Sequence, residues 1–299
     1  MRNVIIDNPA LGPRPSEPSP VFAAIRARSL LAMFVAAGAL WIGAFVLLWP
    51  EELEIEEAPL PDALTGLALY ALLALFLWLA CLRAGVIDRF SLGRRPERRE
   101  TWAYILLAVP LIGMAVVGLY ILYLPLSYFF PAFVTEILLE ELPPLIWWRA
   151  EPQFLLASLI NALMLVVIAP VIEETFFRGF LLSRWWRKYG VPRAVVFSSL
   201  AFAFVHVDII GGFVFGVVLS LIYVKTKSLI GPIIVHASNN AITILEVLLE
   251  GVVTGEIEMV YTLEEFRSYW WLALLGAAVG VPWLLWFVKR LLRREAVAA

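Results

Sequence analysis

Long runs of hydrophobic residues, separated by short polar segments, dominate this sequence. A helix needs about 20 apolar residues to cross the hydrocarbon core of a bilayer, which is about 30 Å thick. Four runs of roughly this length contain no acidic or basic side chain: 29–49, 63–82, 102–124 and 269–288. Four others are closely spaced and carry polar residues at or inside their ends: 154–172, 194–207, 209–224 and 228–249. The pattern predicts an all-α, polytopic transmembrane helix bundle with about eight spans.

The segments between these runs divide the chain into four regions. Region 1–28 begins with 20 proline-rich and polar residues, which predict a disordered cytoplasmic tail and not a cleaved signal peptide. Region 29–152 holds the N-terminal transmembrane helices and an outer segment at 126–148, either an interfacial helix or a charged loop. Region 153–249 is a helical core with unusual polar residues. Region 250–299 combines an outer acidic loop, the last transmembrane helix and a basic tail.

The amino-acid composition agrees with a lipid environment. Hydrophobic residues make up 62% of the chain and charged residues 16%, against about 45–50% and about 25% in soluble domains. Cys81 is the only cysteine, so an internal disulfide and a cysteine metal cluster are both excluded. We therefore expect an integral, multi-pass membrane protein, located in the cell membrane if the source is prokaryotic. Its expected partner is the lipid bilayer, and we expect no binding to nucleic acid.

Basic residues separate onto one side of the predicted membrane. If the chain has eight spans, 20 of its 23 lysines and arginines fall on the side of the N-terminus. The exceptions are Arg149, Arg178 and Arg267. The loops on the opposite side carry most of the acidic residues. Because cytoplasmic loops are enriched in lysine and arginine, this distribution predicts that both termini are cytoplasmic. Removing one span would invert the later loops and destroy the pattern.

Ionisable residues follow the inner end of the hydrophobic run 154–172. Glu173, Glu174 and Arg178 stand there between apolar residues, although each such group costs about 2.5–3.5 kcal/mol on membrane-insertion scales. Glu174 and Arg178 are one helical turn apart with the acid first, the favourable order for an ion pair. Glu173 is then free for chemistry. Charge compensation at a helix end is the alternative for the pair.

Both histidines of the chain lie in hydrophobic runs. His236 shares a helix face with Asn240, one turn later, and His206 has the same relation to Phe202, a pocket wall or ordinary core residue. At about 1.5 Å per residue, His206 lies about 18 Å and His236 about 12 Å from the inner ends of their runs. Glu173 lies about 28 Å from the outer start of its run. We expect these groups to meet in the cytoplasmic half of the bilayer.

Three short motifs follow one another on consecutive apolar segments. They are E-E-x-x-x-R (Glu173, Glu174, Arg178), F-x-x-x-H (Phe202, His206) and H-x-x-x-N (His236, Asn240). This set resembles the CPBP family of CAAX proteases and bacteriocin-processing proteins, whose best understood members are type II CAAX prenyl endopeptidases. The resemblance covers residues 154–249.

The resemblance implies a hydrolase that cuts a membrane-anchored peptide or protein near the cytoplasmic face. The implied catalytic residues are Glu173, His206, His236 and Asn240, supported by Glu174, Arg178 and Phe202. Glu173 and His206 would activate water, and His236 and Asn240 would stabilise the oxyanion. This agrees with general chemistry, because a desolvated carboxylate can act as a base and fixed donors stabilise developing charge at low dielectric.

The sequence also leaves a zinc mechanism open. One carboxylate with two histidines matches a catalytic zinc set, here Glu173 or Glu174 with His206 and His236, and members of the family are often described as metalloproteases. The helix motif H-E-x-x-H is absent. We favour a site without metal or other cofactor.

Two other functions compete with proteolysis. The first is a non-enzymatic or maturation-linked membrane protein of the same fold, acting in bacteriocin immunity or regulation. The second is a proton-coupled transporter, which is disfavoured because no paired hydropathy repeat with broken helices is evident. A prenylated substrate is not implied by these residues, because fold and site do not fix the peptide.

Overall fold

The computed structural model describes residues 21–48, 59–139, 146–254 and 262–297. All regular elements in these ranges are helical, which confirms the predicted all-α class. Within them, six helices are long and apolar enough to cross a membrane, and two shorter apolar helices, Val191–Ala203 and Trp271–Phe287, accompany them. The eight-span count and the cytoplasmic position of the termini stay predictions from the hydrophobic and charge patterns.

Each predicted span corresponds to a helical stretch. Six runs lie, to within two residues at their ends, in α1 (Ala27–Leu48), α2 (Pro59–Arg83), α3 (Arg98–Phe129), α9 (Ile209–Thr226), α10 (Ile230–Thr254) and α12 (Trp271–Val297). The 154–172 run belongs to one continuous helical stretch made of α5 (Pro152–Leu163), η5 (Met164–Ile168), α6 (Ala169–Glu174), η6 (Thr175–Leu182) and α7 (Ser183–Tyr189). Both η5 and η6 are π-helical, a conformation that occurs frequently at functional sites.

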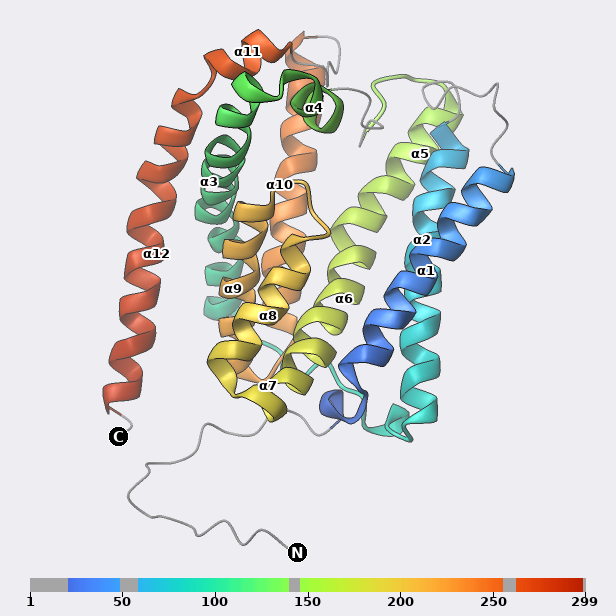
Figure 1. The fold of residues 1–299 in the computed structure, drawn as a ribbon, viewed down its shortest axis with the longest axis vertical. Coiled ribbons are helices and arrows are strands. Elements are labelled where there is room, and N and C mark those ends of the chain that lie inside the picture. The colour runs from blue at the N-terminus through green and yellow to red at the C-terminus, as the bar shows by residue number, and fades with distance from the viewer. Residues whose placement is uncertain (1–20, 49–58, 140–145, 255–261, 298–299) are drawn as a thin grey trace, which may run out of the picture.

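The hydrophobic run 194–207 forms only a short helix, α8 (Val191–Ala203), with 13 residues. At about 1.5 Å per residue it is about 20 Å long, too short to cross a core of about 30 Å. After α8 the chain turns, and the Asp208 carboxylate accepts the Gly211 N–H to cap the start of α9. The α8–α9 connection therefore lies near mid-height in the bundle (Figure 1).

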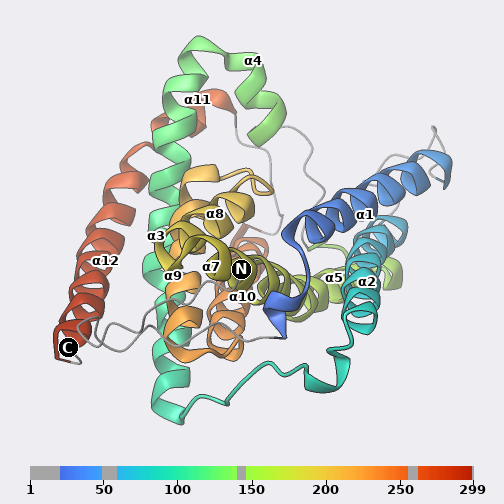
Figure 2. The same cartoon turned by 60° about the horizontal axis from the view of Figure 1, so that its bottom comes forward.

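The helices form a central group with a helix pair on either side (Figures 1 and 2). α6, α8, α9 and α10 occupy the middle, α1 and α2 flank them on one side, and α3 and α12 flank them on the other. α3 packs against α9, α10 and α12, while α2 packs against α1 and α5. α1 begins and α12 ends at the same end of the bundle (Figure 1).

The glycine pair Gly212 and Gly216 brings α9 close to α8. A Cβ added at Gly216 would lie 2.9 Å from the Cα and Cβ of Ser199, and one at Gly212 would lie 3.4 Å from the Cα of Ala203. The G-x-x-x-G spacing thus permits the close helix contact that such steps support in membranes.

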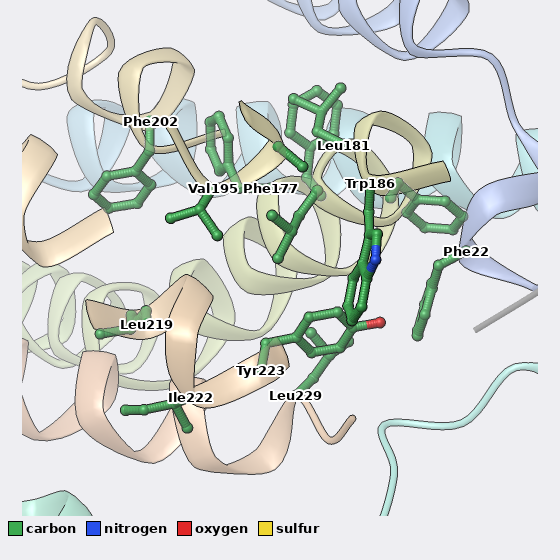
Figure 3. Close-up of a cluster of buried hydrophobic side chains, with 14 of the residues drawn as sticks. Phe22, Phe177, Leu181, Trp186, Val195, Phe202, Leu219, Ile222, Tyr223 and Leu229 are labelled. Atoms are coloured by element: carbon green, nitrogen blue, oxygen red, sulfur yellow. The ribbon is translucent and has the colours of Figure 1, made fainter. Parts of the chain in front are cut away.

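The predicted disordered tail, 1–28, is corrected at its end. Residues 1–20 lie outside the described part, but η1 (Phe22–Ala24) packs into the core. Phe22 is 3% exposed and meets the rings of Phe180 and Tyr223 edge-on; Figure 3 shows it beside Tyr223. The apolar side chains that follow the proline-rich stretch bury enough surface to order this segment.

The predicted outer segment 126–148 is not one helix. Its first residues complete α3, Phe130 leaves the helical conformation, and α4 (Pro131–Val134) starts anew, followed by π-helical η4 (Thr135–Leu139). A residue before proline disfavours helical dihedral angles, which explains the break at Phe130. Glu140 and Glu141 lie outside the described residues. The remaining short elements are η3 (Ile87–Arg89) and α11 (Leu263–Ser268).

Candidate active site

Glu174 and Arg178 form the predicted ion pair, and both are fully buried. Arg178 Nη1 donates to Glu174 Oε1 across 2.8 Å, and each side chain has 0% exposure. The Arg178 guanidinium also lies 4.2 Å from the ring centroid of Phe202, within the range of a cation–π contact. Phe202 in turn packs edge-on against Phe177 in the main core (Figure 3), so the Arg178 guanidinium lies against a buried aromatic cluster.

His236 on α10 makes a second contact with Glu174. Its Nδ1 lies 2.9 Å from Glu174 Oε1, and its side chain is 6% exposed. An ionised carboxylate can only accept hydrogen bonds, so Nδ1 donates and Nε2 is the ring nitrogen that remains. A carboxylate that holds one imidazole nitrogen fixes the ring orientation. Glu174 therefore links Arg178 and His236, a role that the i, i+4 spacing did not reveal.

His206 is positioned by the turn after α8, which corrects the expectation that it lies within a helix. Its Nδ1 lies 2.7 Å from the Phe202 carbonyl oxygen, which can only accept, so Nδ1 donates there as well. The imidazole stacks on the Phe202 ring with 4.2 Å between centroids. Phe202 thus supports His206 as the F-x-x-x-H motif indicated, and the Nε2 atom of His206 is directed towards Glu173.

Glu173 on α6 faces both histidines. Its Oε2 atom lies 4.0 Å from His206 Nε2 and 4.0 Å from His236 Nε2, and its side chain is 15% exposed. The structure therefore brings together the three groups that the sequence singled out. A separation of 4.0 Å is too long for a direct hydrogen bond. It suits groups that share a bridging water molecule.

Asn240 lies one turn after His236 and faces η5. Its Nδ2 donates to the Leu165 carbonyl oxygen across 2.8 Å. An amide nitrogen has two N–H groups, so one holds η5 and the other can serve a ligand. This contact ties α10 to the π-helical stretch just before the two glutamates.

Two cavities meet at this group of residues. One, of about 210 Å³, is lined by Tyr70 and Glu173 together with His206, His236 and Asn240. The other, of about 220 Å³, shares the two histidines and Asn240 and extends to Asp208, Asn239 and Phe215. His206, His236 and Asn240 therefore line both cavities.

Tyr70 is the site residue that sequence reasoning missed. Its hydroxyl group lies 2.6 Å from Glu173 Oε1, and it belongs to α2, 103 residues earlier. The sequence did contain a hint, because a tyrosine in the middle of the apolar run 63–82 needs a partner for its hydroxyl group. Nothing in a single sequence identifies that partner across so long a separation.

A zinc ion would not fit this geometry without rearrangement. Ligands at a tetrahedral zinc with bonds of about 2.0–2.1 Å lie about 3.3 Å apart, whereas the two Nε2 atoms each lie 4.0 Å from Glu173 Oε2. No group of three or more histidine, cysteine, aspartate or glutamate side chains among the described residues is arranged to hold a metal. We therefore derive the chemistry from the side chains alone.

The helical bundle with the buried Glu174, Arg178 and His236 side chains defines a multi-pass membrane protein with a polar site inside it. Residues 155–242 match the family model described as Type II CAAX prenyl endopeptidase Rce1-like. This segment is therefore an Rce1-like domain of the CPBP family, a family of intramembrane proteases, and it contains all seven predicted motif residues. No curated protein and no solved structure matched the chain.

Proposed function

We propose that this protein is an intramembrane endopeptidase that hydrolyses a peptide bond of a membrane-associated protein or peptide near the cytoplasmic face. The observation that carries the proposal is the position of Glu173 Oε2, which lies 4.0 Å from the Nε2 atoms of both histidines. A water molecule held among these three atoms would be the nucleophile, as the match to a protease family suggests.

The hydrogen bonds of the two imidazoles support different roles for them. His206 donates from Nδ1 to a backbone carbonyl, so its neutral form offers a lone pair at Nε2 to one hydrogen of the water. Glu173 takes the other hydrogen as the oxygen attacks the peptide carbonyl carbon. Glu173 then delivers that proton to the departing amine, and an acid and an amine result.

His236 is better suited to stabilise the oxyanion. Because its Nδ1 donates to Glu174, it can donate from Nε2 only as the imidazolium ion. Glu173 and Glu174 lie 4.0 Å and 2.9 Å from its two ring nitrogens, so a positive charge on this imidazole would have carboxylate partners on both sides. The second N–H of Asn240 would add another donor to the oxyanion.

Comparing protein termini in whole membranes would test this function. Cells expressing the wild-type chain and a Glu173→Ala variant at equal levels should differ in a small set of new termini at membrane-anchored segments, present only with the wild type. Glu136→Ala is a matched control, because Glu136 is an exposed carboxylate on η4, outside the site. Identical termini in all three would contradict proteolysis, and bacteriocin protection that survives Glu173→Ala would favour the immunity alternative.

A chelator should leave this activity essentially unchanged. We expect 1,10-phenanthroline to alter the cleavage rate of the purified protein by less than about twofold, because metal-dependent sites lose activity when their metal is removed and this site has no ready zinc geometry. Metal analysis of the same sample provides the control. Loss of activity that added Zn²⁺ restores would show that the mechanism requires a metal.

A further inference from the structure

Tyr70 comes from outside the family-like segment and contacts its central carboxylate. The match covers residues 155–242, whereas Tyr70 lies on α2, near the middle of the predicted second span. The Tyr70 hydroxyl group lies 2.6 Å from Glu173 Oε1 and lines the same cavity as the two histidines. No other hydrogen bond from the described residues reaches the Glu173 carboxylate.

This contact assigns separate tasks to the two carboxylate oxygens. An ionised carboxylate only accepts, so Tyr70 donates, and 2.6 Å is the length of a charge-assisted O–H···O⁻ bond. With Oε1 held by Tyr70, Oε2 is the oxygen that faces His206 and His236. The last torsion of a glutamate side chain is broad and roughly twofold, so packing alone would not define which way the carboxylate plane points.

The backbone around Tyr70 holds α2 close to the site. Gly66, one turn earlier, faces Met164 of η5, and a Cβ added there would lie 3.2 Å from the Met164 sulfur. α2 also contacts α6, which carries Glu173, and packs along α5. Close helix packing therefore places the tyrosine ring beside Glu173, which lowers the entropy cost of keeping the hydrogen bond.

We propose that Tyr70 is a positioning residue that fixes the orientation of the Glu173 carboxylate so that its Oε2 atom faces the attacking water. The proposal rests on the endopeptidase function proposed above and adds a residue that the three motifs do not contain. It also makes α2 part of the active site, so the Rce1-like segment alone lacks a group that its glutamate needs.

Steady-state kinetics of a Tyr70→Phe variant tests the proposal. The probe is an internally quenched peptide with the sequence around a cleavage site found in the terminus comparison, and the enzyme is the full chain in proteoliposomes. We expect kcat to fall about tenfold or more, since small misplacements of a catalytic group cost up to about 10²-fold. KM should stay within about twofold, because Tyr70 acts on the reacting carboxylate and not on uniform substrate binding.

Two matched variants separate positioning from a general structural effect. Tyr223→Phe removes another buried hydroxyl group, which pairs with Ser183 Oγ at 3.0 Å in the core, and should leave kcat unchanged. Replacing Tyr70 by 4-aminophenylalanine restores a donor at the same place and should recover most of the lost rate. The thermal unfolding temperature of Tyr70→Phe should equal that of Tyr223→Phe.

The outcomes distinguish this proposal from the proposed function. If the wild type and Glu173→Ala give the same termini, the endopeptidase function fails and the role of Tyr70 fails with it. If the wild type cleaves the probe and Tyr70→Phe keeps its kcat, only the role of Tyr70 is overturned. A rate loss that the amino analogue does not recover, or that Tyr223→Phe reproduces, also overturns it.

Discussion

Replacing Glu173 by glutamine lowers kcat by about 10³-fold or more. Proton transfer by a positioned side chain contributes about 10²–10⁴-fold, and the amide can neither take a proton from water nor return it to the amine. Glutamine keeps the size of the side chain and still accepts a hydrogen bond from Tyr70, so the cavity should keep its shape. The loss therefore measures the base and not the packing around it.

A second substitution shows whether Glu173 and His206 act together. His206→Ala alone should also lower kcat strongly, but adding it to Glu173→Gln should cost little more, since residues that act as a unit are far from additive. The four proteins are compared with the quenched peptide in proteoliposomes, and their unfolding temperatures serve as the folding control. Fully multiplicative losses would mean that the two residues do not activate the same water molecule.

Replacing Arg178 by methionine destabilises the protein by about 3–5 kcal/mol, because removing one partner of a buried ion pair leaves the Glu174 carboxylate without its guanidinium partner. Glu174 is 0% exposed and would retain only His236 as a polar partner among the described residues. For a chain of this size we expect the unfolding temperature to fall by about 5–15 °C.

Two comparisons make this prediction specific. Arg94→Met breaks an ion pair of similar length, 2.7 Å to Glu100, but with side chains 52% and 35% exposed, and should cost less than about 1 kcal/mol. A Glu174→Gln, Arg178→Met double variant removes both charges and keeps an acceptor for His236, so it should be more stable than Arg178→Met alone. Scanning fluorimetry in detergent gives all the values. Equal stability of Arg178→Met and Arg94→Met would disprove the role of the buried pair.

The hydrophobic pattern could predict the helices because lipid imposes a strict physical condition on them. Every backbone polar group in the bilayer core must be satisfied inside the segment, so each apolar run of sufficient length had to be helical. The pattern could not show that α8 stops at Ala203, because the residues that follow it are also apolar and the turn depends on the Asp208 cap. It also could not show that Phe22 is buried, which depends on distant partners such as Phe180.

Helical spacing and the free-energy cost of burying ionisable groups in lipid were sufficient to predict part of the candidate site. Glu173, His206 and His236 stood out because ionisable groups are expensive in lipid, and the structure places them within 4.0 Å contacts. The contact between Glu174 and His236 spans 62 residues, and that between Tyr70 and Glu173 spans 103. Such pairs depend on how helices pack, and a single sequence carries no direct record of packing.

The short helix α8 also constrains how the protein is assembled. A segment of 13 residues cannot enter a bilayer as a separate spanning helix during synthesis, so α8 has to be inserted with α9 as a hairpin. His206 sits at the tip of that hairpin and acquires its neighbours only when the hairpin docks against α6 and α10. The site can therefore assemble only after the last of these helices, α10, has left the ribosome.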